Sequence, residues 1–203
     1  MRPEQQTIED ADAALVARCQ SGDLSAFDEL VGRHQKRMLN VAYRMIGNYD
    51  EACDVVQEAF LGAYRSIGSF RRESRFTTWM CTIVMNHAKN RLQQRKARHS
   101  RECASIDAPI ETGEGCMVRQ IKSGADSALE RMERQDIQKR VQDCIATLER
   151  EHREVLVLRD MQGHSYEEIM AMLKLPDGTV KSRLHRARSA MKDCLSDIIG
   201  ELT

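Results

Sequence analysis

The sequence predicts an all-α protein in which two small helical domains are joined by a flexible linker. Aromatic residues make up only 4% of the 203 residues, and 11 Gly with 3 Pro supply few turns, which disfavours a sandwich of strands. Apolar residues recur at helical spacing through both halves of the chain. Between the halves, residues 100–127 collect Pro, Gly and Ser without a sustained period, as linkers do. We therefore expect domains at residues 1–99 and 128–203.

The first long helix is predicted at residues 27–45, where apolar side chains follow one another at helical steps. Ser25 is placed to cap its start, because a serine oxygen can accept hydrogen bonds from the free N–H groups of a first turn. Gly47 is placed to end it, since glycine readily adopts the left-handed conformation that follows a helix.

A second helix is predicted at residues 52–67, where apolar residues alternate at gaps of three and one and so form one buried stripe. Gly68 is placed to end it. At 100° per residue, the opposite side of this helix is acidic, and we expect it to face solvent or a partner. The residues of this acidic face are Asp50, Asp54, Gln57 and Glu58.

An arginine-rich loop at residues 69–75 comes next, and a further helix is expected from about residue 79 to residue 98. Thr77 or Thr78 is placed to cap that helix. The loop and helix lie in a strongly basic segment, because residues 65–101 contain ten Lys or Arg and one acid.

Aromatic residues within this basic segment suggest a single nucleic-acid strand as its ligand. An aromatic ring can stack on an unpaired base for about 1–3 kcal/mol, and neighbouring cations follow the backbone. Phe70 stands alone among charges and is the better candidate for touching a base, whereas Trp79 is expected in the core. The candidate residues are Phe70, Arg71, Arg72, Arg75, Asn86, His87, Lys89, Asn90 and Arg91.

The carboxy-terminal half is expected to begin with one or two helices at residues 129–148 and to end with a pair of helices separated by a tight turn. Ser165 and Glu168 form a capping box, in which each side chain satisfies a free backbone donor at the start of the first helix of the pair. Pro176 suits the first position of the second helix, where its missing N–H would be unpaired anyway.

The second helix of this pair fits the recognition helix of a helix-turn-helix. Val180, Leu184 and Ala187 share an apolar side that would pack on the first helix. Such a helix fits the major groove of B-form DNA, where Arg can bond guanine and flanking cations can hold phosphates. The alternative is a solvated basic helix on a bundle; the capping box, turn and proline favour the helix-turn-helix. The candidate residues are Lys181, Ser182, Arg183, His185, Arg186 and Arg188.

The net charge of zero conceals two separate positive surfaces. The 31 basic residues cancel the 31 acidic ones, yet residues 174–192 hold six Lys or Arg and one acid. A local positive surface attracts phosphates whatever the total charge, so a nucleic-acid partner fits this sequence.

Several classes of protein are disfavoured. The sequence has no P-loop, G-x-G-x-x-G, H-E-x-x-H or G-x-S-x-G motif, so we expect no enzyme, no catalytic residue and no cofactor. The seven cysteines are scattered without a C-x-x-C pair, so we expect reduced thiols rather than disulfides, and no metal site. No run of about 18–20 apolar residues is present, so we expect no membrane insertion and a cytoplasmic location.

Three motifs in register resemble the extracytoplasmic-function, or group IV, sigma factors of bacterial RNA polymerase, a sigma-E-like branch of the sigma-70 family. They are DEACDVVQEAF at residues 50–60, FTTWM at residues 76–80, and SYEEI at residues 165–169 followed by GTVKSR at residues 178–183. The resemblance runs from about Asp12 to Leu195. Cys53 and Ala59 depart from it, because the family more often has an acid and a threonine at these positions.

The resemblance implies a sigma-2 domain, a linker and a sigma-4 domain. Sigma-2 would bind the clamp helices of the largest polymerase subunit through the acidic face and would recognise and open the −10 promoter element through the loop and helix after it. Sigma-4 would read the −35 element and rest on the polymerase flap. An anti-sigma factor is expected by resemblance only. The rival interpretation is a stand-alone helix-turn-helix regulator that binds operator DNA as a dimer.

Overall fold

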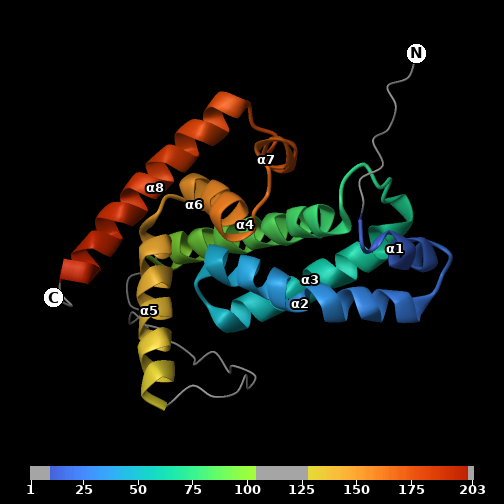
Figure 1. Ribbon diagram of the computed structural model, residues 1–203, viewed down its shortest axis with the longest axis horizontal. Helices are drawn as coiled ribbons and strands as arrows, with labels where there is room; N and C mark the ends of the chain where they lie inside the picture. The colour runs from blue at the N-terminus through green and yellow to red at the C-terminus, as the bar shows by residue number, and fades with distance from the viewer. Residues whose placement is uncertain (1–9, 104–127, 201–203) are drawn as a thin grey trace.

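The computed structural model describes residues 10–103 and 128–200, and the regular structure in these two ranges is entirely helical, as predicted (Figure 1). The predicted linker falls largely outside the described residues, since its first residues, 100–103, end a helix and residues 104–127 are not described. No helix within the described ranges is long and apolar enough to cross a membrane.

The amino-terminal half consists of α1 (Ala13–Gln20), α2 (Leu24–Ile46), α3 (Tyr49–Ser66), a short 3₁₀ turn η1 (Ile67–Ser69) and α4 (Phe76–Cys103). Helices α2, α3 and α4 pack against one another in pairs, and α1 lies against α2. Their shared core is apolar, and its fully buried side chains include Leu30, Met38, Val41, Phe76 and Met80. Burial of these side chains gives this half its stability, because each large apolar side chain contributes about 1.5–3 kcal/mol.

Two of the predicted caps in this half are wrong. The carboxylate of Asp23, rather than Ser25, accepts hydrogen bonds from the first turn of α2. Helix α4 starts at Phe76, whose N–H donates to Asp10 Oδ2 at 2.7 Å, so that Thr77 and Thr78 lie inside the helix. The predicted end of α2 is confirmed, because Gly47 has a left-handed φ of 83°.

The carboxy-terminal half consists of α5 (Ala128–Thr147), α6 (Arg150–Leu156), a π-helical turn η2 (Val157–Met161), α7 (Tyr166–Leu173) and α8 (Asp177–Gly200). The predicted capping box is confirmed, since Ser165 accepts from the Glu168 N–H and Glu168 accepts from the Ser165 N–H. Pro176 stands one residue before α8, and its carbonyl accepts from the N–H groups of Thr179 and Val180. Helices α7 and α8 thus form the predicted helix pair.

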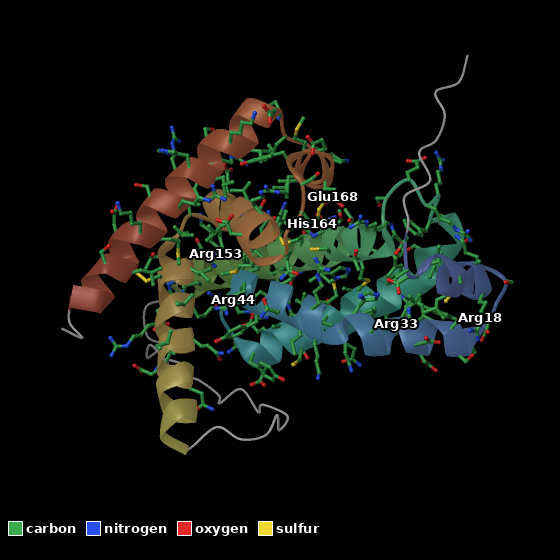
Figure 2. All side chains as sticks on the ribbon, viewed as in Figure 1. Arg18, Arg33, Arg44, Arg153, His164 and Glu168 are labelled. Atoms are coloured by element: carbon green, nitrogen blue, oxygen red, sulfur yellow. A yellow bond between two sulfur atoms is a disulfide. The ribbon has the colours of Figure 1, made fainter. Side chains whose placement is uncertain are left out.

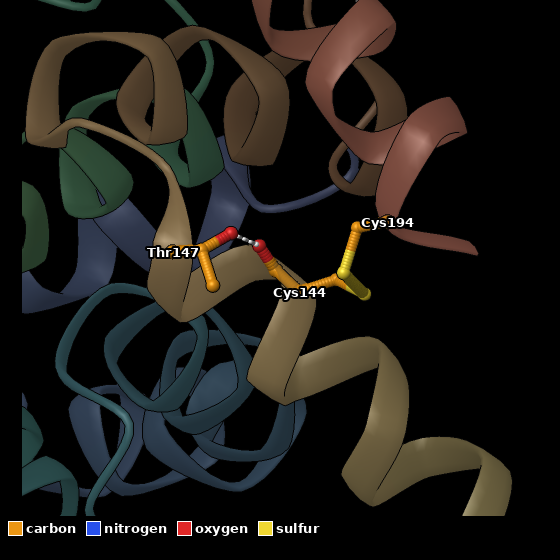
Figure 3. The surroundings of a disulfide bond; sticks show 3 residues. All are labelled: Cys144, Thr147 and Cys194. Atoms are coloured by element: carbon orange, nitrogen blue, oxygen red, sulfur yellow. Dashed lines mark hydrogen bonds between the residues drawn. A yellow bond between two sulfur atoms is a disulfide. The ribbon is translucent and has the colours of Figure 1, made fainter. Parts of the chain in front are cut away.

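The expectation that the cysteines are all reduced thiols is wrong, because Cys144 on α5 and Cys194 on α8 form a disulfide (Figure 3). The packing of α5 on α8 brings their Cα atoms to 5.9 Å, although the two residues are 50 positions apart. Sequence spacing carries no signal for such a pair, since it depends on tertiary packing. Cys19, Cys53 and Cys81 are free, and the side chains of Cys103 and Cys116 are outside the described ones.

The two halves also pack against each other. Helix α7 lies against α4, and α2 contacts α5, α6 and η2 (Figure 1). Buried apolar residues of both halves form one continuous cluster, which runs from Leu15 in α1 to Ala187 in α8. The predicted division into two helical units therefore comes with a direct contact between them.

Candidate nucleic-acid interface and acidic face

Helix α8 presents the residues predicted to read bases. Val180, Leu184 and Ala187 are buried on α7 and its neighbours, as the periodicity predicts. On the other side His185 and Arg186 are exposed. Neither of these two side chains has a hydrogen bond or ion pair with the described part of the chain. A free guanidinium on the outer side of such a helix can donate two parallel hydrogen bonds to guanine.

The flanking cations of α8 are each held by an acid of the same half. Lys181 pairs with Asp177 at 2.7 Å, and this hydrogen bond raises the pKa of Lys181. Arg183 pairs with Glu151, and Arg188 makes two hydrogen bonds to Asp160, at 2.9 and 2.5 Å. The Lys181 and Arg188 pairs are exposed, and such pairs contribute only about 0–1 kcal/mol, so phosphates can replace these two carboxylates at little cost. The sixth predicted residue, Ser182, is exposed and donates to the Thr179 carbonyl.

Tyr166, the first residue of α7, also belongs to this surface. Arg159 lies 4.7 Å and Lys181 5.8 Å from the centre of its ring, both at cation–π distance. Tyr166 also lines a small pocket of about 330 Å³ together with cationic residues of α8, among them Lys181, Arg188 and Lys192. The signal that could have revealed the place of Tyr166 on this surface is its position directly after the capping residue Ser165, at the end of α7 that faces α8.

The arginine-rich loop before α4 is only partly as predicted. Arg71, Arg72 and Arg75 are exposed, and Arg72 has a left-handed φ of 57° while its side chain donates to Gln20 Oε1 at 2.9 Å. The expectation that Phe70 stands alone is wrong: only 8% of it is exposed. Its ring stacks on Trp79, with the two centroids 4.7 Å apart.

The reason for the burial of Phe70 lies in the first turn of α4. Phe76 and Trp79 present their rings toward the loop and form an aromatic cluster that receives Phe70. Gln20 fixes the loop by donating to the carbonyls of Ile67 and Phe70, at 3.0 and 2.9 Å. Stacking of Phe70 on a base stays a prediction, and it requires this ring to leave Trp79.

The candidate residues on α4 are exposed amides and side chains that lie against carboxylates. Asn86 and Asn90 are exposed. The Nδ1 atom of His87 lies 3.5 Å from Glu58, and Arg91 lies 3.2 Å from Glu58 and 4.0 Å from Asp54. Lys89 instead pairs with Glu154 of α6 at 2.9 Å. Lys89 and Arg91 are thus each paired with a carboxylate within the protein.

The acidic face is exposed, as predicted. Asp54 and Glu58 are 63% and 55% exposed, and Asp50 and Gln57 are exposed as well. The four residues lie along the outer side of α3, which packs inward through Val55, Ala59 and its other small and apolar residues.

An apolar groove of about 920 Å³ lies between α2 and α3 beside the acidic face. Three large apolar side chains on its wall are strongly exposed: Leu24 at 61%, Leu61 at 52% and Tyr64 at 44%. Leu61 and Tyr64 both lie within residues 52–67, where the sequence predicts one buried stripe, yet both side chains are exposed. Exposed apolar walls with a charged rim are typical of a groove that accepts an amphipathic helix.

A metal centre finds no support among the described residues, where no group of three His, Cys, Asp or Glu side chains comes together. The buried carboxylate of Asp12 instead receives hydrogen bonds from Arg33 at 3.1 Å and shares one with His34 at 2.7 Å. This network ties the start of α1 to α2 and has a structural role.

Comparison with known proteins relates both halves to one family. Residues 30–98 match the family model of sigma-70 region 2, and residues 138–191 match that of sigma-70 region 4. The RNA polymerase sigma-H factor of Pseudomonas aeruginosa is 38% identical over 194 residues, which cover 95% of this chain and 98% of that protein. The ECF RNA polymerase sigma-E factor of Escherichia coli K12 is 36% identical over 189 residues, covering 93% and 96%.

Two solved structures share the fold. The sigma factor RpoE of Bartonella quintana, solved with the anti-sigma factor NepR, has a TM-score of 0.66 at 21% identity, covering 85% of this chain and 98% of that one. CnrH, solved with the cytosolic domain of CnrY, has a TM-score of 0.62 at 24% identity, covering 93% and 99%.

Proposed function

We propose the roles of the two halves of this chain, which belongs to the extracytoplasmic-function sigma factors of the sigma-70 family. It is an alternative sigma factor: it binds core RNA polymerase and directs transcription initiation at specific promoters. Residues 1–99 act as the sigma-2 domain, residues 128–203 as the sigma-4 domain, and residues 100–127 as the linker between them. The protein is an initiation factor rather than an enzyme, and it works in the bacterial cytoplasm beside the polymerase.

The acidic face is the surface that binds the core enzyme. Asp50, Asp54, Gln57 and Glu58 would contact the clamp helices of the largest polymerase subunit. The observation that carries this assignment is their exposure beside the groove between α2 and α3, because a helical partner then meets apolar walls and a charged rim together. Leu61 and Tyr64 add the apolar part of this contact.

Promoter recognition is divided between α8 and the segment from the arginine-rich loop into α4. Arg186 and His185 would read the −35 element in the major groove, with Lys181, Ser182, Arg183 and Arg188 on phosphates or neighbouring base edges. The residues from Phe70 to Arg91 would recognise and hold the −10 element in its opened form. Support comes from the free guanidinium of Arg186 and from the exposed amides of Asn86 and Asn90.

The isolated chain would not open promoter DNA. Separating a bubble of roughly eleven base pairs costs about 1.4 kcal/mol of stacking per step, whereas one base stacked on Phe70 returns about 1–3 kcal/mol. The protein would therefore capture one or two bases of an element that polymerase helps to keep open. A permanganate footprint of a duplex promoter with the chain alone is expected to show no reactive thymines, and reactive thymines would contradict this mechanism.

An anti-sigma factor is the further partner that we propose. The solved structures of RpoE and CnrH contain the anti-sigma factor NepR and the cytosolic domain of CnrY, respectively. The groove between α2 and α3 and the acidic face beside it are the surfaces that an inhibitor must cover to keep this chain from core polymerase.

In vitro transcription tests the proposed function. Purified core polymerase and this chain are combined on fragmented genomic DNA, and the 5′ ends of the transcripts are mapped. Starts that depend on the chain and share two sequence elements upstream are expected. Transcripts that are the same with and without the chain would contradict the proposal, and so would tight binding of the chain alone to a palindromic operator.

A further inference from the structure

The short helix α1 is joined by hydrogen bonds to both ends of the arginine-rich loop. It packs against η1, directly before the loop, and Figure 1 shows the segment between η1 and α4 beside α1. A helix of only eight residues has little stability of its own, so contacts with its neighbours decide whether it forms. The contacts between α1 and the loop therefore fix both partners.

Gln20, the last residue of α1, holds the start of the loop at three points. Its amide nitrogen donates to the carbonyls of Ile67 and Phe70, at 3.0 and 2.9 Å. Its amide oxygen accepts a hydrogen bond from the guanidinium of Arg72 at 2.9 Å. One half-buried amide thus uses its donor and its acceptor on a segment that lies 50 positions further along the chain.

The contact with Gln20 matters most for the backbone at Arg72. Arg72 has a φ of 57°, in the left-handed region that residues other than glycine seldom adopt. Such a conformation persists only where the surrounding structure holds it. Gln20 holds it from both sides, since it binds the carbonyl of Phe70 and the side chain of Arg72. The loop therefore keeps its shape through Gln20.

Asp10, shortly before α1, holds the other end of the loop. Its Oδ2 atom accepts from the N–H of Phe76 at 2.7 Å, and its Oδ1 atom accepts from the N–H of Asp12 at 3.1 Å. Asp12 is held in turn by Arg33 at 3.1 Å and by His34 at 2.7 Å. Figure 2 shows Arg33 on the side of the amino-terminal half where α1 lies. The two ends of α1 thus bracket the arginine-rich loop.

These bonds hold the backbone of Phe70 and leave its side chain able to turn. Gln20 binds the carbonyl of Phe70, whereas the ring stacks on Trp79 at 4.7 Å and meets the edge of Phe76 at 6.4 Å. Rotation about the Cα–Cβ bond can move the ring from Trp79 to an unpaired base while the loop stays in place. Binding then requires little ordering of the backbone, and a preorganised loop binds more tightly for that reason.

We propose that Gln20 is a positioning residue for recognition of the −10 element. It acts through the arginine-rich loop: together with Asp10 it fixes the backbone, so that the ring of Phe70 can exchange Trp79 for a base without loss of the loop's shape. This role rests on the proposed function, because it is defined by the DNA that the loop would bind. The −35 surface on α8 and the acidic face on α3 do not depend on this contact.

Trp79 provides a native reporter of the loop, because it is the only tryptophan of the chain. Phe70 covers one side of its half-buried indole. When the loop is no longer held, Phe70 leaves the indole more often, and a collisional quencher such as acrylamide reaches the indole more easily. This measurement requires neither DNA nor polymerase.

The test compares the wild-type chain with Gln20→Met and Gln20→Glu. Methionine keeps the size of glutamine without its three hydrogen bonds, while glutamate keeps the acceptor for Arg72 and loses the donor to the two carbonyls. In both variants the acrylamide quenching constant of Trp79 is expected to rise about twofold.

DNA binding is measured with each chain assembled on core polymerase. The probes are a single-stranded oligonucleotide that carries the −10 element of a start mapped with this chain, and a scrambled oligonucleotide. Both Gln20 variants are expected to bind the −10 oligonucleotide about fivefold to thirtyfold more weakly, because roughly one backbone position must be ordered on binding. The preference over the scrambled oligonucleotide is expected to fall by the same factor, while co-purification with core polymerase stays at the wild-type level.

Ser21→Ala is the matched control. Ser21 directly follows Gln20, and its hydroxyl donates to the carbonyls of Ala17 and Arg18 within α1, at 2.8 and 3.2 Å. The control therefore weakens the end of α1 without touching the arginine-rich loop, and its quenching and −10 preference should match the wild type. Equal changes in Ser21→Ala and Gln20→Met would trace the effect to the loss of α1 and would overturn the role of Gln20.

The outcomes separate this role from the proposed function. Wild-type −10 preference in both Gln20 variants would overturn the positioning role, whether or not quenching has risen, even if the wild-type chain directs transcription. A wild-type holoenzyme that binds both oligonucleotides equally would overturn the −10 assignment of the loop and the role of Gln20 with it, while quenching would still show whether Gln20 holds the loop. If circular dichroism shows that Gln20→Met has lost its helices, Gln20→Glu decides in the same way.

Discussion

Arg91 of α4 donates a hydrogen bond to Glu58 of α3 at 3.2 Å, so a cation proposed to hold DNA is bound by a carboxylate proposed to hold polymerase. His87 approaches the other oxygen of Glu58 at 3.5 Å. One carboxylate thus contacts two residues that are proposed to bind DNA, while it is itself proposed to bind polymerase. Core polymerase that engages Glu58 would release the Arg91 guanidinium and the His87 ring toward the −10 element, which would link assembly with polymerase to DNA binding.

Replacement of Glu58 by Gln is expected to strengthen DNA binding by the free chain and to weaken its assembly with core polymerase. The pair is partly exposed, at 27% for Arg91 and 55% for Glu58, so the gain in DNA affinity is about twofold to fivefold. Fluorescence anisotropy with single-stranded −10 DNA measures this gain. Glu29→Gln is the matched control, because Glu29 is also exposed and pairs with Arg33 of α2. Equal gains in both variants would mean that only net charge had changed.

Arg186→Ala is expected to cost about 1–3 kcal/mol of −35 binding by the holoenzyme and to relax specificity at one position of the element. The reason is that the Arg186 guanidinium has no partner in the described part of the protein and points away from the buried side of α8. Lys181→Ala is the comparison. It should weaken binding to all sequences alike and should make binding less dependent on salt concentration. Binding measured over a library of single-base variants distinguishes the two, and a uniform loss for Arg186→Ala would make it a phosphate contact.

Cys194→Ser is expected to lower the free energy of unfolding of the carboxy-terminal half by about 2–4 kcal/mol under oxidising conditions. The disulfide to Cys144 closes a loop across 50 positions, which contains α6, α7 and most of α8, and so restricts the unfolded chain. Urea denaturation with and without dithiothreitol measures the effect. The variant should not respond to the reductant, whereas Cys53→Ser, at a free cysteine, should respond as the wild type does. Identical curves for Cys194→Ser and the oxidised wild type would contradict the bridge.

Stability is expected to fall as the pH drops below about 6.5, with His164 as one cause. Burial lowers the pKa of His164; Glu168 acts in the opposite direction, and Arg37 adds to the lowering. As the pH falls, His164 therefore takes up a proton in the unfolded chain before it does so in the folded chain. The stability that the neutral His164 contributes is complete above the unfolded pKa and is lost as the pH falls from about 6.5 toward the lower folded pKa. The slope from one such group is at most about 1.4 kcal/mol per pH unit. Thermal denaturation of His164→Gln should show a shallower slope, and the exposed control His185→Gln should keep the wild-type slope.

The sequence predicted the parts of the fold that depend on neighbouring residues. The stripe along α3 and the capping box of α7 come from positions a few residues apart, so periodicity and local chemistry are enough. The cap of α2 shows the limit of this approach, because Asp23 and Ser25 are both good caps and only the backbone decides between them. The buried and exposed sides of α8 follow from the same local rule.

What the sequence could not predict depends on contacts between distant residues. Asp10 caps α4 from 66 positions away, and Cys144 meets Cys194 only because α5 packs on α8. Phe70 was expected in solvent because its neighbours in the chain are charged, whereas its neighbours in space are Trp79 and Phe76. The groove between α2 and α3 and the pairing of Lys89 with Glu154 likewise arise from tertiary packing.

The affinity for one promoter fragment, measured with the free chain and with the chain assembled on core polymerase, tests the central claim most directly. The fragment carries both elements of a mapped start and is titrated at fixed ionic strength, because phosphate contacts are strongly salt-dependent. We predict weak binding by the free chain and tight binding by the holoenzyme, with protection of both elements. Equal affinities in the two titrations would contradict the account, because the reading surfaces would then bind DNA without the polymerase that is proposed to engage Glu58 and free its partners.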